Sequence, residues 1–167
     1  VGWDIPPWTG VTLDTRISVA KAVISELVKD TSISWGFGTW TTDSAGYTEA
    51  NDYSIIHVGC NAHTTEHQAR LQAAIAATES RSSTPFSRSF VAGRKYFQGT
   101  RSDEFGTFFV EAACQPKFVI EVTDGMGNID STLQNTVERA HLLADAGVTA
   151  VAIGFGLSEL DAAPLYA

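Results

Sequence analysis

The second half of the 167-residue chain alternates apolar strand-like runs with a helical pattern, and this order constrains the fold most strongly. Lys117–Thr123 is predicted to be a buried strand ending at Asp124, and Val148–Phe155 is predicted to be another. Between them, Ser131–Asp145 has helical spacing of apolar residues, and Gly147 is placed to end that helix. Strands joined through a crossover helix run parallel, so the order predicts a doubly wound α/β sheet.

Three more helices are predicted upstream of these elements. Arg16–Lys29 shows an amphipathic stripe and is expected to be capped by Asp14 or Thr15. A second helix is expected from about Thr65 to Thr78, and a third begins at Ser82–Pro85, where a hydroxyl cap precedes proline in the first helical position. The residues expected to face inward in the helix over Ser131–Asp145 are Leu133, Val137, Ala140 and Ala144.

The other predicted segments are strands and connections. Alternating apolar and small residues indicate a strand over Ile33–Trp40, and a short apolar run indicates another over Ser54–Val58. The polar stretch Thr41–Tyr53 between them is expected to be a loop or hairpin, and Gly99–Gln115 an irregular connection. The Pro-containing opening, Val1–Thr12, is expected to be surface coil.

Composition excludes several classes of function. The length suits one domain, and 44% hydrophobic with 18% charged residues is ordinary for a folded chain. A formal net charge of -8 repels nucleic acid and anionic membranes, and no apolar run approaches the ~20 residues that span a bilayer. We therefore expect no nucleic-acid binding and no membrane insertion, and the negative charge instead favours cations or basic partners.

The order of elements after Arg16 resembles the von Willebrand factor A domain. Ser83-Thr84-Pro85-Phe86 is similar to the second metal motif of that family, and the run from Phe118 to Gly125 to its third. Gly147–Gly156 resembles the following strand with its glycine-rich exit. The resemblance implies a mostly parallel sheet with an antiparallel edge strand. Residues 1–15 would be an extended leading segment and 16–167 a partial domain, with the central first strand expected upstream of this chain and the closing strand downstream.

Within that family, the chain looks most like the type IV pilus-associated adhesin and biogenesis proteins. The resemblance lies in Thr84-Pro85-Phe86 leading to Tyr96-Phe97, and in the run from Cys114 to Ile120 before Thr-Asp-Gly. It implies surface adhesion or pilus assembly without catalysis, at the cell surface or a pilus tip. The implied partners are pilus or filament subunits, or a host or surface ligand.

The family's metal-ion-dependent adhesion site begins with Asp-x-Ser-x-Ser after the central strand, and this motif is absent here. The nearest sequence, Asp14 to Ser18, has an Arg in the middle and is interpreted as a helix cap. Thr84 and Asp124 remain as oxygen ligands for Mg²⁺ or Ca²⁺ in the intact parent protein. The alternative is that Thr84 caps its helix and Asp124 caps a turn.

A cluster of histidines suggests a different chemistry. His57, Cys60, His63 and His67 lie within eleven residues, and His63-x-x-Glu66-His67 matches a zinc-hydrolase pattern in which the glutamate activates water. That pattern needs both imidazoles on one helical face, whereas Thr64 and Thr65 are better as helix caps, which would leave His63 outside the helix. Solvated histidines near a helix start are the simpler interpretation, and a purely structural role in a filament assembly is a further alternative.

The two cysteines, Cys60 and Cys114, leave several states open. If the edge strand is antiparallel, as the resemblance implies, both lie at the amino edge of the sheet. A disulfide, bonds to partners outside the chain, and free thiols all remain open from the sequence.

Overall fold

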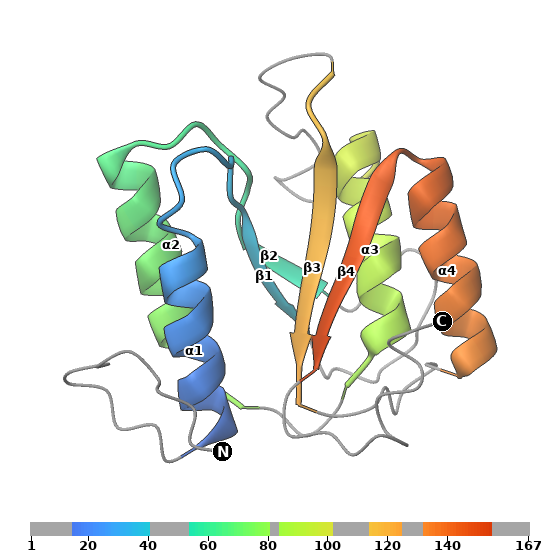
Figure 1. The fold of residues 1–167 in the computed structure, drawn as a ribbon, viewed down its shortest axis with the longest axis horizontal. Helices are drawn as coiled ribbons and strands as arrows, with labels where there is room; N and C mark the ends of the chain where they lie inside the picture. Colours follow the sequence, from blue (N-terminus) through green and yellow to red (C-terminus); the bar gives the residue numbers. More distant parts are fainter. Residues whose placement is uncertain (1–14, 41–53, 81–83, 102–113, 125–131, 155–167) are drawn as a thin grey trace, which may run out of the picture.

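The computed structural model describes residues 15–40, 54–80, 84–101, 114–124 and 132–154 (Figure 1). The predicted coil at the start of the chain and the loop over 41–53 lie outside the described residues, as do most of the connection after Gly99 and the last predicted strand residue, Phe155. The elements in chain order are α1 (Arg16–Leu27), β1 (Phe37–Trp40), β2 (Ser54–Val58), α2 (Thr65–Ala77), α3 (Phe86–Gln98), β3 (Lys117–Thr123), α4 (Leu133–Asp145) and β4 (Val148–Gly154).

The strands form two small sheets. β1 and β2 pair antiparallel, with an irregularity between Phe37 and Gly38, and β3 and β4 pair parallel in register from Lys117 opposite Val148. The parallel crossover through α4 and the antiparallel partner of β1 are therefore confirmed. Among the described residues the two pairs are not joined by hydrogen bonds, so the structure is mixed α/β without one continuous sheet.

Each sheet has its own core. Four residues, Val28, Val58, Leu71 and Ile75, are buried together where α2 covers β1 and β2 and α1 packs against α2. Phe86, Phe90, Leu143 and Val148 are buried together where α3 and α4 cover β3 and β4.

Helix α3 also connects the two halves, because it contacts β2 as well as β3 and β4. It approaches β3 closely at Gly93, where an added Cβ would lie 2.5 Å from Cγ2 of Val119. Among the described residues, no helix is long and apolar enough to cross a membrane.

Strand β1 begins later than predicted because backbone carbonyls before it make hydrogen bonds with side chains outside the sheet. The Trp35 indole donates a hydrogen bond to the carbonyl of Asp30 at 3.1 Å. The Trp35 carbonyl is hydrogen-bonded to His67 Nε2 at 2.8 Å. The residues from Ile33 to Gly36 therefore form a connection from α1, and ladder pairing begins only at Phe37.

The predicted start of α3 is wrong by one residue. Pro85 occupies the N-cap position instead of the first helical turn, and no side chain caps the helix. The reason is packing: Pro85 is among the most deeply buried residues, and its carbonyl accepts the N–H of Arg88 at 3.0 Å.

The predicted inward face of α4 is partly wrong. Ala140 packs against the core as expected, but Leu133 is 51% exposed and Ala144 is exposed, while Thr136 and Leu143 are buried. Thr136 tolerates burial because its hydroxyl donates to the carbonyl of Thr132 at 2.9 Å.

Candidate functional site

The two sequence-predicted metal ligands lie around the carboxyl end of β3. Asp124 directly follows the last residue of β3, and Thr84 lies two residues before α3. Both line one cleft, together with Thr15 and Arg16 at the start of α1. Segments far apart in the sequence are thus brought to one edge, where parallel strands end and helices begin.

Arg16 is the member of this site that sequence reasoning missed. Its Nη1 lies 3.6 Å from Oδ2 of Asp124 and donates to the Asp124 backbone carbonyl at 3.3 Å. The two side chains are 63% and 48% exposed, so the pair is accessible to a partner. The sequence contained one indication: a cation at the first position of a helix opposes the helix dipole, and a nearby acid offsets that unfavourable effect.

The interpretation of the segment from Asp14 to Ser18 as a helix cap is confirmed for Thr15 to Ser18, the part that the structure describes. The Thr15 hydroxyl accepts the N–H of Ser18, and the Ser18 hydroxyl accepts the N–H of Thr15, both at 3.2 Å. This capping box satisfies two N–H groups at the start of α1. Both hydroxyls are therefore engaged in holding the helix start.

The oxygens at this edge fit part of a site for a hard cation. A hydroxyl and a carboxylate are the ligand types that Mg²⁺ and Ca²⁺ prefer, but Thr84 and Asp124 supply only two of the six or more oxygens required. The Arg16 guanidinium lies 3.6 Å from the Asp124 carboxylate, in a partly exposed ion pair. In the part of the chain that the structure describes, no group of three or more His, Cys, Asp or Glu side chains is arranged for a metal.

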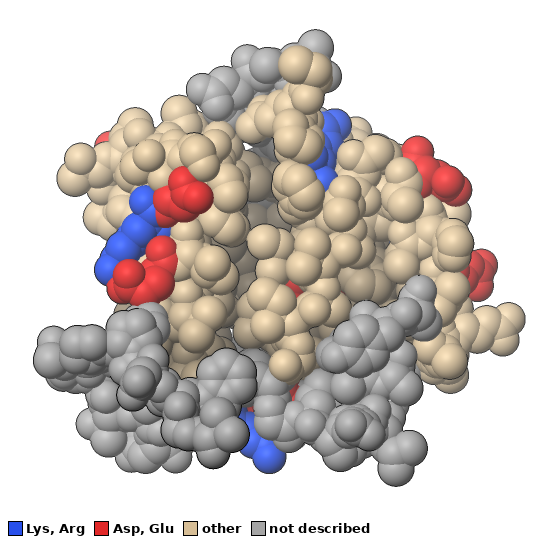
Figure 2. All heavy atoms as spheres, viewed as in Figure 1, with Lys and Arg blue, Asp and Glu red and all other residues tan. Residues whose placement is uncertain are grey.

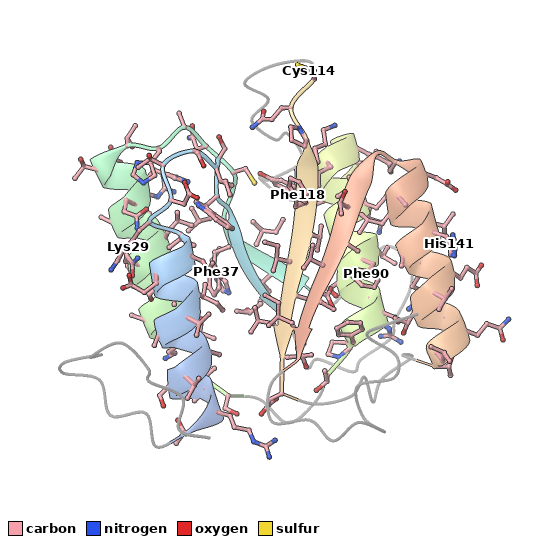
Figure 3. The ribbon with its side chains drawn as sticks, in the orientation of Figure 1. Lys29, Phe37, Phe90, Cys114, Phe118 and His141 are labelled. Atoms are coloured by element: carbon pink, nitrogen blue, oxygen red, sulfur yellow. The ribbon has the colours of Figure 1, made fainter. Side chains whose placement is uncertain are left out.

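The cleft that opens at this edge is large and mainly apolar. It encloses about 1010 Å³ and is lined by residues of β1 and β3, with α1 and α3 supplying its other walls. Figure 2 shows it as a recess between the half that contains α1 and the half that contains β3. Phe118, near the amino end of β3, is 48% exposed, and Ile120 is 39% exposed (Figure 3).

Glu121 is the unusual residue of this cleft. It is 5% exposed, and among the described residues neither of its carboxylate oxygens has a hydrogen-bond partner. Burial raises the pKa of Glu121 well above its ordinary value of 4.5. The sequence reasoning overlooked it, although one acid in the middle of the apolar strand Lys117–Thr123 was a visible signal.

The histidines are separated by the fold. Helix α2 begins at Thr65 with Thr64 as its cap, so His63 lies outside the helix as predicted. His67 is 6% exposed and bonds the Trp35 carbonyl, so the expectation of solvated histidines is wrong for this residue. His57 Nε2 is hydrogen-bonded to the Thr39 hydroxyl at 2.7 Å, and the His57 ring stacks on Phe37. Each of the latter two imidazoles thus has a structural contact.

Both cysteines are free thiols in the structure. Cys114 precedes β3 at its amino end (Figure 3), while the Cys60 N–H donates to the Tyr96 hydroxyl at 2.7 Å. Burial raises the pKa of the Cys60 thiol and of the Tyr96 phenol. The tie between Cys60 and Tyr96 fixes the end of β2 against α3.

Comparison with protein-family models, with curated proteins and with solved structures gives no match to this chain.

Proposed function

We propose that this chain is a binding domain for protein partners, acting in surface adhesion or pilus assembly, with its recognition site at the carboxyl end of β3. The observation that carries the proposal is the meeting of Thr84, Asp124 and the amino end of α1 at the mouth of one cleft. An accessible cation and an accessible acid side by side suit the recognition of charged groups on another protein.

The proposed architecture is a von Willebrand factor A-like doubly wound sheet. A parallel pair crossed over by α4, an antiparallel outer pair and helices on both halves support this proposal. In it, β1 and β3 flank the position of a central strand. The extracellular location at a pilus tip, and pilus subunits or a surface ligand as partners, belong to the same proposal and rest on the sequence resemblance.

A Mg²⁺ or Ca²⁺ ion would be held by Thr84 and Asp124 together with oxygens from outside the described residues. When bound, such an ion supplies a coordination position for a carboxylate of the partner. Arg16 competes with a cation for the same Asp124 carboxylate, because its positive guanidinium lies 3.6 Å away and repels a cation bound there. We therefore propose that Arg16 weakens metal binding while the pair is intact.

Calorimetric titration of the full chain with MgCl₂ or CaCl₂ tests this site. We expect weak binding that is lost in Asp124→Asn and reduced in Thr84→Val, and that becomes several-fold tighter in Arg16→Gln. Glu138→Gln, an exposed substitution on α4, is the control and should bind as the unaltered chain does. Metal binding that ignores both Asp124→Asn and Arg16→Gln would refute the proposed ligand set.

The zinc-hydrolase alternative predicts a different titration. It requires stoichiometric Zn²⁺ and activity that is lost in Glu66→Gln. The contact of His67 Nε2 with the Trp35 carbonyl favours the binding role, because it leaves Nδ1 as the one ring nitrogen of His67 for a metal. If neither Mg²⁺, Ca²⁺ nor Zn²⁺ binds, a structural role in a filament assembly becomes the better proposal.

A further inference from the structure

We propose that Thr39 and His57 form a nucleophile–base pair that hydrolyses carboxylic esters whose apolar acyl chain lies in the cleft. This activity goes beyond the proposed binding function. It uses neither a metal at the carboxyl end of β3 nor the histidines of the zinc pattern, His63 and His67.

The two side chains are close enough to exchange a proton. Thr39 lies on β1 and His57 on β2, and Oγ1 of Thr39 lies 2.7 Å from Nε2 of His57. In the neutral tautomer with the proton on Nδ1, Nε2 accepts a hydrogen bond from the hydroxyl. A hydroxyl bonded to a base in this way is an activated nucleophile, because the base takes the proton as the oxygen attacks.

A β-bulge places His57 beside Thr39. The ladder between β1 and β2 shifts register between Phe37 and Gly38, because His57 is inserted as an extra residue between two paired residues of β2. A bulge turns a side chain out of the regular alternation, and bulges are common next to active sites. The His57 ring is held in this direction by stacking on Phe37, with ring centroids 5.9 Å apart and planes inclined by 27°.

The cleft beside this pair specifies the substrate. Thr39 and His57 line the same cleft as Ile24 of α1 and Phe118 and Ile120 of β3. Its volume of about 1010 Å³ matches the upper end of the range for small-molecule sites, and its walls are mainly apolar. The His57 side chain is exposed, so water reaches the imidazole. The cleft therefore fits an ester with an uncharged, apolar acyl chain, such as an octanoyl group.

The reaction that this pair supports begins with transfer of the acyl group to the protein. Oγ1 of Thr39 attacks the carbonyl carbon of the ester, and its proton passes to Nε2 of His57. The bond between the carbonyl carbon and the alcohol oxygen then breaks, and the departing alcohol takes the proton from the imidazolium. The acyl group remains as an ester of Thr39.

Water completes the reaction. Nε2 of His57 accepts a proton from water as the water oxygen attacks the acyl carbon. The bond from that carbon to Oγ1 of Thr39 breaks, the threonine oxygen recovers the proton from His57, and the carboxylic acid leaves. The overall change is hydrolysis of one ester to one acid and one alcohol, with both side chains restored.

Hydrolysis of para-nitrophenyl octanoate by the full chain tests the proposal, with the release of nitrophenolate giving kcat/KM. Positioned general-base assistance contributes about 100-fold or more, so Thr39→Val and His57→Gln should each lower kcat/KM by about 100-fold. Thr39→Ser keeps a hydroxyl and should retain most of the activity. The activity should persist in EDTA, which separates it from zinc chemistry, and para-nitrophenyl acetate should be a poorer substrate because its acyl group leaves most of the cleft unfilled.

Two matched substitutions are the controls. Thr149→Val removes an exposed hydroxyl from β4, and His141→Gln removes an exposed imidazole from α4 (Figure 3); both should keep the activity of the unaltered chain.

Mass spectrometry of the unaltered chain, mixed with the octanoate ester and quenched in acid, should find the octanoyl group on Thr39. This measurement needs no variant to fold. Three results would overturn the proposal: the unaltered chain hydrolyses the ester no faster than buffer does; Thr39→Val hydrolyses it as fast as the unaltered chain; or the octanoyl group is found only on other residues.

Discussion

The buried carboxyl of Glu121 should make the stability of this protein depend on pH in a direction opposite to that of most acids. Its pKa in the folded chain is raised well above 4.5 by burial, while the unfolded chain has the ordinary value. Between these two pKa values the folded state retains a proton that the unfolded state has released. The free energy of unfolding therefore falls by about 1.4 kcal/mol per pH unit as the pH rises through this window.

Urea unfolding at pH 5, 6 and 7 measures this loss. The stabilising contribution is fully present below pH 4.5 and is lost as the pH rises toward the folded-state pKa, so Glu121→Gln should flatten the dependence. Glu138→Gln, an exposed matched substitution, should keep the original slope. Parallel pH profiles for the unaltered chain and Glu121→Gln would refute the reasoning.

Three further predictions concern packing and capping. Leu143→Ala should lower the free energy of unfolding by about 3 kcal/mol in urea titration, because Leu143 is fully buried, whereas the adjacent Leu142→Ala, 40% exposed, should cost about 1 kcal/mol or less. Equal losses would contradict the observed face of α4. Gly93→Ala should cost about 1–3 kcal/mol through its clash with Val119, and a double-mutant cycle with Val119→Ala should show the clash relieved; strict additivity would argue against it. Thr15→Ala should cost about 1 kcal/mol in thermal unfolding followed by circular dichroism, and an unchanged Tm would mean that the capping box contributes nothing.

The sequence pattern alone was sufficient to predict the elements that depend on interactions between residues close together in the chain. The bounds of β2 and β3 match the prediction, and α1 begins at Arg16 with one of the two expected caps. Gly147 has the positive φ of 74° that its position after α4 requires. These features depend on alternation, capping and turn chemistry within a few residues.

Features that depend on distant contacts were not predictable in this way. The start of β1 is set by the bond between the Trp35 carbonyl and His67, which are far apart in sequence. The buried face of α4 is set by how α3 and β4 meet it, so the apolar Leu133 is exposed while Thr136 is buried.

The residues of the candidate site likewise fall into those that the sequence pattern predicted and those that depend on distant contacts. Its strand-end acid, Asp124, and the hydroxyl of Thr84 followed from their positions beside a strand and a helix. The pairing of Arg16 with Asp124 spans 108 residues and depends on how α1 packs beside β3. No local pattern contains that information.

The most direct test of the proposed binding site is paramagnetic relaxation by Mn²⁺ in ¹⁵N-resolved NMR spectra of the full chain. Mn²⁺ takes the same oxygen ligands as Mg²⁺ and broadens amide signals near it. The proposal predicts selective broadening at Thr84, Asp124 and Thr15, reversed by excess Mg²⁺ and absent in Asp124→Asn. Broadening centred on other residues, or broadening at this edge that survives Asp124→Asn, would contradict it.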